Sequence, residues 1–278
     1  MTADTVGAAD GSIDGSGTSR ARCVLAPNPS PMTLDGTNTW LISEPGAGSA
    51  LVLDPGPEDE GHLQRICAVA GEAGQRVEQI VLTHRHPDHS AGAARLAELT
   101  RAPVRAVDPA HRLGSEGLAA GDVLDVGGCI LRVIATPGHS DDSVCLELAA
   151  DGAVLTGDTV LGRGTTVIAR DGSLGDYLDS LHRLRRLAAE TRLVALLPGH
   201  GPLLANPAAV LDFYLTHRAE RLAEIEAALA AGDKTPAEIV ARVYAAVDPA
   251  LWRFAESSVR AQLDYLQGRG EVPPDVSW

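Results

Sequence analysis

The sequence predicts an α/β fold: an αβ/βα sandwich of two mixed sheets faced by helices, followed by a small helical domain. Short apolar runs alternate with turn residues up to about residue 205, and four of these runs lead into a histidine or aspartate. After residue 205 the spacing of the apolar residues becomes helical. We therefore expect a large domain over residues 21–205, a helical domain over 206–278 and a disordered tail over 1–20.

The apolar runs place the elements of the large domain in order. Each predicted strand is a short run of Val, Leu, Ile or Ala bounded by Gly, Pro or Asp, and each predicted helix repeats apolar residues every three or four positions. We take Ser90 as the N-cap of the second helix. We expect strands at 40–42, 50–53, 79–83, 130–134, 144–148, 153–156 and 193–197, and helices at 61–74, 91–99 and 176–187.

The smaller domain is expected to hold helices at 208–231, 236–247 and 249–267. A terminal hairpin or wing at 270–273 would follow them. The apolar side chains of the first helix form one stripe, which we expect to pack on the large domain. Trp252 and Phe254 are two of the few aromatic residues, and core packing is the more common role for such side chains.

Composition excludes several classes of protein. The net charge of −14 argues against nonspecific binding to nucleic acid, which depends on basic surfaces. No run of about 18 apolar residues and no signal-peptide pattern is visible, so we expect a cytoplasmic protein without a membrane segment. The four cysteines lack C-x-x-C spacing, which is typical of reduced thiols. Residues 1–20 are rich in Gly, Ser, Thr, Ala and Asp, the basis for the predicted tail.

The strongest motif is His-Arg-His-Pro-Asp-His at residues 84–89. Imidazole and carboxylate are the donors that suit zinc and related ions. Residues two apart in an extended turn point the same way, so His84 and His86 can share one metal, while Asp88 and His89 face the adjacent position. A solvated turn with three histidines by chance is the alternative, but only nine histidines occur in 278 residues.

Three further candidates follow apolar runs: His139, Asp158 and His200. Taken singly, a histidine after Pro-Gly or an aspartate after Gly is more often a turn residue. Together with the first motif they complete seven metal-type side chains, and this joint pattern favours a two-metal site. His62, His111, His182 and His217 have no such neighbours, and we expect most of them at the surface.

A second group of residues suggests contact with the substrate. Arg163, Thr165 and Thr166 follow Asp158 in a glycine-rich loop, and Arg163 would bind an anionic group; an ordinary surface loop is the alternative. Residues 37–39 (Thr-Asn-Thr) are interpreted as turn residues, with a role in supporting the ligands from behind as the alternative.

The segments 83–89, 136–140, 156–159 and 198–201 resemble the successive metal motifs of the metallo-β-lactamase superfamily, in order and in spacing. Residues 28–41 and 161–166, followed by a helical domain, resemble the β-lactamase-like protein 2 group, whose members carry a winged-helix-like C-terminal domain. That group often has Tyr where this chain has Trp40. The resemblance covers about residues 23–205.

The resemblance implies an αβ/βα metallo-β-lactamase sandwich with two Zn²⁺ ions, for which manganese or iron are alternatives. His84, His86 and His139 would hold the first ion, Asp88, His89 and His200 the second, and Asp158 would bridge them. Two such cations lower the pKa of a shared water and present hydroxide to the substrate. Asp88 would also move the proton, as the catalytic residue. Persulfide dioxygenases share the fold but use one iron, so the complete second site favours hydrolysis.

Two enzymatic functions remain, and a binding module without catalysis is disfavoured by seven intact ligands. The first is hydrolysis of a small ester, thioester, lactone or lactam. The second is cleavage of single-stranded RNA, because the mitochondrial animal member of the resembled group is an endoribonuclease. Residues 206–278 contain seven Lys and Arg against eleven Asp and Glu, a net charge of −4. We favour a small-molecule substrate, with this domain as a cap or a homodimer contact, and keep nucleic acid as the alternative partner.

Overall fold

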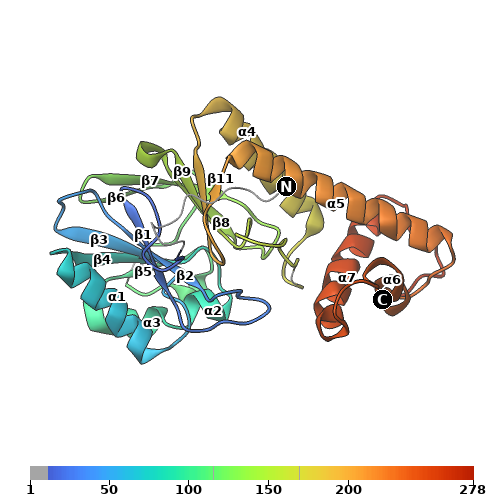
Figure 1. Ribbon diagram of the computed structural model, residues 1–278, viewed down its shortest axis with the longest axis horizontal. Coiled ribbons are helices and arrows are strands. Elements are labelled where there is room, and N and C mark those ends of the chain that lie inside the picture. The colour runs from blue at the N-terminus through green and yellow to red at the C-terminus, as the bar shows by residue number, and fades with distance from the viewer. Residues whose placement is uncertain (1–11, 115, 169) are drawn as a thin grey trace.

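The computed structural model describes residues 12–114, 116–168 and 170–278, and two sheets form its larger part (Figure 1). The first sheet has the strand order β1-β2-β3-β4-β5, with antiparallel pairs from β1 to β3 and parallel pairs from β3 to β5. Its strands are β1 (Ala21–Leu25), β2 (Asn38–Ile42), β3 (Ser49–Leu53), β4 (Arg76–Val81) and β5 (Val104–Arg105).

The second sheet has the order β11-β10-β9-β8-β7-β6, and only its β9–β10 pair is parallel. Both sheets are therefore mixed, as predicted for the αβ/βα sandwich. The strands are β6 (Val123–Val126), β7 (Cys129–Ala135), β8 (Val144–Leu148), β9 (Ala153–Gly157), β10 (Ala195–Pro198) and β11 (Leu204–Ala205).

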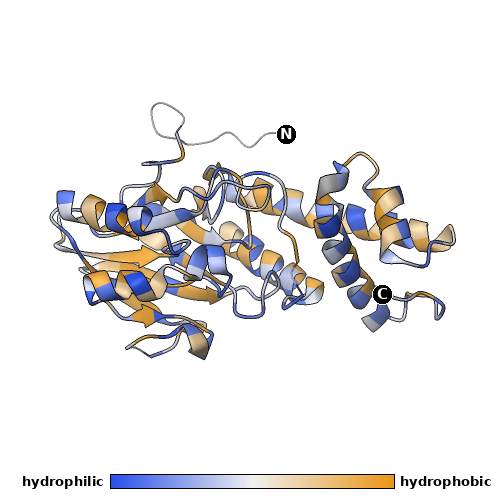
Figure 2. Cartoon of the chain, turned by 90° about the horizontal axis from the view of Figure 1, so that it is seen from below, coloured by the Kyte–Doolittle hydropathy of each residue, from blue (hydrophilic) through white to orange (hydrophobic). Residues whose placement is uncertain are grey.

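The main core lies between the two sheets. Trp40 and Leu53 from the first sheet share one buried cluster with Leu131 and Leu155 from the second. The strands of both sheets are mostly hydrophobic in Figure 2, while the helices around them alternate between hydrophobic and hydrophilic residues. Burying apolar surface on both sides of the strands is what fixes the two sheets against each other.

Helices cover the outer faces of the sandwich. Leu63 and Ile66 of α1 and Leu96 of α3 pack on the first sheet. Tyr177 and Leu181 of α4 pack on the second sheet. The helices are α1 (Glu60–Glu72), α2 (Pro87–Ser90), α3 (Ala93–Thr100) and α4 (Leu174–Glu190), with short 3-10 turns at Pro109–His111 and Ala149–Asp151.

The structure corrects the predicted tail. Residues 1–11 lie outside the described residues, but residues 12–20 are in contact with the sandwich. The amide of Gly15 donates to the carbonyl of Cys23 at 2.9 Å. Arg20 forms ion pairs with Glu44 at 2.7 Å and with Asp151 at 2.6 Å. Arg20 and this backbone hydrogen bond hold the segment beside β1. The amino-acid composition, on which the predicted tail was based, does not reveal such contacts.

The C-terminal helices are α5 (Pro207–Ala230), α6 (Pro236–Val243) and α7 (Trp252–Gly268), with a 3-10 turn at Pro249–Leu251. Helix α5 runs from the sandwich to the separate group formed by α6 and α7 (Figure 1). Its first half packs with α4, and its second half packs with α6 and α7, where Trp252 also packs as expected. The terminal hairpin predicted at 270–273 is not found: the described residues contain no strand after Ala205. The described residues also contain no helix that is both long and apolar enough to cross a membrane.

Candidate metal centre

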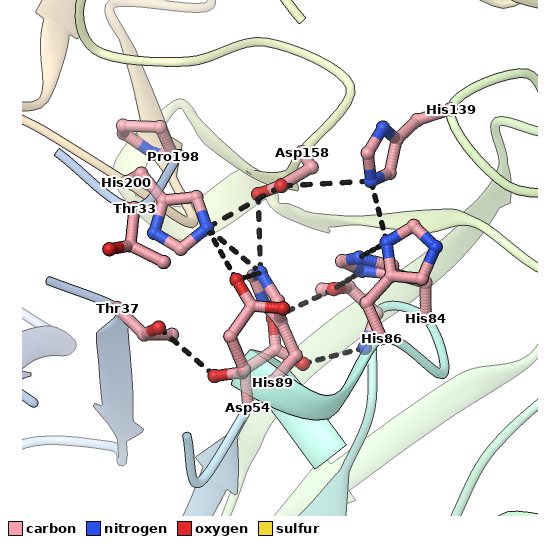
Figure 3. A network of polar contacts seen from close by, with 12 residues as sticks. Thr33, Thr37, Asp54, His84, His86, His89, His139, Asp158, Pro198 and His200 are labelled. Carbon is pink, nitrogen blue, oxygen red and sulfur yellow. Dashed lines mark hydrogen bonds and ion pairs between the residues drawn. The ribbon is translucent and has the colours of Figure 1, made fainter. Parts of the chain in front are cut away.

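The structure brings all seven predicted ligands to one place. His84, His139, Asp158 and His200 each lie just beyond the end of a strand, at the same edge of the sandwich. Helix α2 begins directly after His86, and its single turn carries the remaining two candidates. The side chains form three overlapping groups whose ligand atoms lie within 4.8 Å of one another (Figure 3): His84, His86 and His139; His84, His89 and Asp158; and Asp88, His89 and His200.

The first group is made of three imidazoles. His86 presents its Nδ1 atom at 3.1 Å from Nε2 of His84 and at 2.9 Å from Nε2 of His139. Nε2 of His86 lies 3.5 Å from Asp171. Three ring nitrogens at these distances surround a space that a single cation would fill.

The group of Asp88, His89 and His200 combines two imidazoles with a carboxylate. Nε2 of His89 lies 3.1 Å from Nε2 of His200, and Asp88 Oδ2 lies 3.2 Å from the same His200 atom. Asp158 stands between the two groups. Its carboxylate is 3.4 Å from Nε2 of His200, 3.3 Å from Nε2 of His89 and 3.7 Å from Nε2 of His139.

Gly199 leaves the room that this arrangement needs. A Cβ atom at this position would lie 2.6 Å from Oδ1 of Asp158 and 2.7 Å from Cε1 of His89. Any larger residue would therefore push a candidate ligand out of the centre.

The outer nitrogen of three of the five rings is held by an acceptor, which turns the inner nitrogen toward the centre. Nδ1 of His89 donates to Asp54 at 2.9 Å, and Nδ1 of His139 donates to the carbonyl of Val167 at 2.7 Å. Nδ1 of His200 donates to the carbonyl of Gly36 at 3.1 Å. With the proton fixed on Nδ1, the Nε2 lone pair is free to bind a metal.

Asp54 is a residue of the site that the sequence prediction missed. It follows β3, is 1% exposed and has a positive φ of 53°. Its carboxylate accepts hydrogen bonds from the amide and the hydroxyl of Thr83, each at 2.7 Å, in addition to the one from His89. The Thr83 hydroxyl in turn lies 3.0 Å from Nδ1 of His84. The signal was present, since Asp54 follows an apolar run just as the ligands do.

The interpretation of residues 37–39 as turn residues is wrong. Asn38 and Thr39 lie in β2, and all three side chains are buried. The Asn38 amide donates to the carbonyls of Pro198 and Gly201, at 2.9 and 2.8 Å, and so holds the loop around His200. The Thr37 hydroxyl donates to the carbonyl of Asp88 at 3.0 Å.

Most of the remaining histidines were expected at the surface, and His62, which is 3% exposed, is an exception. Its Nε2 donates to the hydroxyl of Thr39 at 3.0 Å, and that hydroxyl donates to the carbonyl of Asp54 at 2.7 Å. His62 therefore ties α1 to the residues behind the centre.

The electrostatics of the centre favour a cation. Burial lowers the pKa of His89, but the carboxylates of Asp158, Asp54 and Asp88 outweigh burial and hold this pKa well above its usual range. The pKa of His200 is lowered by burial and raised by Asp158 and Asp88, with a net increase to about 9. Burial holds the pKa values of His84 and His139 below normal, so these rings are neutral ligands at pH 7.

The donor set also fits divalent metal ions such as zinc. Five imidazoles and two carboxylates are the ligand types that such ions prefer. Oδ1 of Asp158 is buried and makes no well-directed hydrogen bond with the described residues. Nε2 of His89 and Nε2 of His200 face each other at 3.1 Å although both rings donate through Nδ1. A cation between these atoms would satisfy all three.

The loop after Asp158 holds the residues predicted to bind substrate. Arg163 is exposed and pairs with Asp35, and the Thr165 hydroxyl lies 3.3 Å from Nε2 of His217. The Thr166 hydroxyl is buried and donates to the carbonyl of Asp158 at 2.6 Å. For Thr166 the structure shows contacts within the loop, and substrate binding by all three residues stays a prediction.

An acidic rim lies beside His86. Arg85 pairs with Asp141 at 2.5 Å and with Asp171 at 2.6 Å, and two further carboxylates lie 3.8 Å from the same guanidinium. One positive charge therefore faces four negative ones. The acidic rim consists of Asp108, Asp141, Asp142 and Asp171.

The chain is similar to known proteins in sequence and in fold. Residues 32–200 match the family model of the metallo-beta-lactamase superfamily, and residues 235–277 match that of the beta-lactamase associated winged helix domain. The chain is 33% identical to the beta-lactamase-like protein 2 homolog of Caenorhabditis elegans, over 90% of this chain and 84% of that protein. It is also 33% identical to an atrochrysone carboxyl ACP thioesterase of Aspergillus fumigatus, over 66% of this chain and 56% of that protein. A beta-lactamase domain protein from Burkholderia ambifaria superimposes with a TM-score of 0.75 at 25% identity, over 90% of this chain and 86% of that one.

Proposed function

The chain belongs to the metallo-beta-lactamase superfamily of hydrolytic enzymes, and we propose that it is a two-zinc hydrolase of small acyl substrates. The substrate would be an ester, thioester, lactone or lactam, with a thioester placed first because one relative is named a thioesterase. The observation that supports this most is the convergence of seven donors in three groups that overlap at His84 and His89.

The seven residues divide between two ions. His84, His86 and His139 would hold the first, and Asp88, His89 and His200 would hold the second, with Asp158 between them. When bound, two zinc ions would supply a Lewis acid for the substrate carbonyl and would lower the pKa of a water toward neutrality.

Asp88 is the residue that we assign to proton transfer. Its side chain is 32% exposed, whereas that of Asp158 is 12% exposed. Asp88 therefore faces the opening of the centre, where it can accept a proton from the attacking water and pass it to the leaving group. Arg163 and Thr165, on the loop beyond Asp158, would contact the rest of the substrate.

We propose a small molecule rather than RNA as the partner. The C-terminal region carries a net charge of −4, and the acidic rim lies beside the centre. Phosphate backbones bind to basic surfaces, so both features disfavour RNA. The match to a winged helix domain and the similarity to the beta-lactamase-like protein 2 homologs keep ribonuclease activity as the alternative.

The test is a hydrolysis screen of the zinc-loaded protein on an acyl thioester, a lactone, nitrocefin and single-stranded RNA. We expect about two zinc ions per chain and hydrolysis of the thioester. His84→Ala should abolish the activity, while His182→Ala, an exposed histidine of α4, should not change it. Cleavage of RNA without hydrolysis of any acyl substrate would overturn the proposal.

A further inference from the structure

A buried arginine of α5 lies outside the metal centre. Arg218 is 3% exposed, and no ion pair involves it within the described ranges. Its guanidinium lies over the ring of Tyr177 at 4.9 Å, and its Nη2 donates to the backbone carbonyl of Thr166. A charged group is costly to bury without a counter-ion, which calls for a reason beyond packing.

Two tyrosines hold the same loop. The Tyr214 hydroxyl, also from α5, accepts from the amide of Leu161 at 2.9 Å and lies 3.2 Å from the carbonyl of Gly164. The Tyr177 hydroxyl of α4 donates to the carbonyl of Thr159 at 2.7 Å. The backbone between Asp158 and Ile168 is thus fixed by side chains from two helices.

This loop in turn holds two ligands of the centre. Asp158 begins it, and the Thr166 hydroxyl donates back to the Asp158 carbonyl at 2.6 Å. The next residue, Val167, accepts the hydrogen bond from Nδ1 of His139 at 2.7 Å. The carbonyl that Arg218 binds therefore belongs to Thr166, which carries the first of these supports and directly precedes the second.

We propose that Arg218 is a positioning residue, which holds the loop from outside and so sets the places of Asp158 and His139. The expected effect of Arg218 on metal binding rests on the proposed function. Its expected effect on the loop does not. The role of Arg218 makes α5, the helix that joins the sandwich to the winged helix domain, part of the support of the centre.

The first experiment compares metal binding in Arg218→Met and in the wild type. We expect the zinc affinity, measured by competition with a chelator, to fall about tenfold, as is common when the support of a ligand is lost. The absorption spectrum of the cobalt-substituted protein should also change, because two ligands shift. Arg218→Lys keeps a donor and the charge and should recover part of both. Arg185→Met is the matched control, since Arg185 joins α4 to Asp212 of α5 at the surface, 2.6 Å away.

The second experiment needs no metal. Amide hydrogen exchange of residues 159–168 should be faster in metal-free Arg218→Met than in the wild type, and unchanged in Arg185→Met. Tyr214→Phe, which removes one hydroxyl, should show a smaller increase and decides the matter if Arg218→Met does not fold. Unchanged exchange and unchanged zinc affinity would overturn the inference. A wild type that binds no metal would instead overturn the proposed function, and the exchange data would still test the role of Arg218.

Discussion

At the scale of single residues, Asp54 supports the centre although it is not one of the candidate ligands. Its carboxylate holds His89 directly and His84 through Thr83. Asp54→Asn replaces one acceptor oxygen by an amide donor, which would face the N–H of Thr83 or the Nδ1–H of His89 and so weaken the hold on the His89 ring. We expect zinc affinity or kcat/KM to fall 10- to 100-fold, roughly the range for such supporting residues.

The control for this prediction is Asp59→Asn. Asp59 is the N-cap of α1, and asparagine caps a helix as well as aspartate does, so this variant should behave like the wild type. Zinc affinity and kcat/KM at wild-type levels in Asp54→Asn would show that the hydrogen bond to His89 does not orient it.

The burial of His62 predicts a pH dependence of stability. Burial and the nearby Arg65 lower its pKa to about 4 in the folded protein, below the usual 6.5. Between these values the unfolded chain binds a proton and the folded chain does not, so stability falls as the pH falls from 6.5 to 4. The contribution is about 2–3 kcal/mol across this window.

The measurement is chemical denaturation of the wild type and of His62→Gln at several pH values. Glutamine keeps a donor for Thr39 but does not titrate. The stability of the wild type should therefore fall more steeply with acid than that of the variant. Parallel curves for the two proteins would contradict the prediction.

The sequence predicts ligands better than it predicts their supports. His84, His86, Asp88 and His89 lie within six residues, and the other three candidates follow apolar runs, so the pattern is visible locally. The supports act over long distances in the chain, 35 residues from Asp54 to His89 and 160 from Asn38 to Pro198. Nothing near Asn38 in the sequence distinguishes it from an ordinary turn residue.

At the scale of elements, periodicity predicted most helices and strands to within a few residues, but not how they begin. Ser90 was expected to cap a helix; instead it ends the single turn α2, which Pro87 starts, and its hydroxyl donates to the carbonyl of Arg85. The true N-cap of α3 is Gly92. A cap depends on where the preceding turn ends, which apolar spacing does not show.

Helix α6 offers a test of an element whose cap is fully formed. The Thr235 hydroxyl accepts from the amide of Glu238, and the Glu238 carboxylate accepts from the amide of Thr235. Thr235→Ala should destabilise the C-terminal helices by about 1 kcal/mol, measured by urea denaturation. Thr235→Ser should retain the stability, and catalytic activity should be unchanged in both. A loss of activity equal to the loss of stability would contradict this separation.

At the scale of the whole molecule, α5 belongs to two hydrophobic cores. Leu211 and Tyr214 share a buried cluster with α4 and the second sheet, whereas Ile225 and Leu229 share one with α6 and α7. The expected division between domains at residue 205 stays a prediction. In the structure the last strand ends at Ala205, but the first half of α5 still packs in the core of the large domain.

Two truncated chains test whether α5 contributes to both hydrophobic cores. A chain that ends at Ala205 exposes the apolar surface that α5 covers, and we expect it to aggregate or to lose cooperative unfolding. A chain that ends at Ala231 keeps Leu211, Tyr214 and Arg218 in place and should remain folded. Thermal unfolding and light scattering distinguish the two, and a stable chain ending at Ala205 would contradict the prediction.

The acidic rim beside His86 bears on what happens after the bond is broken. If the substrate is the proposed neutral ester or thioester, hydrolysis would release a carboxylate, which the net negative charge of the rim and Arg85 would repel. Repulsion between partly exposed charges is screened over about 8 Å at physiological salt. Inhibition by the carboxylate product should therefore be weak at low ionic strength and become stronger as salt is added. The four aspartates would thus speed the departure of the acid and keep turnover from slowing as it accumulates.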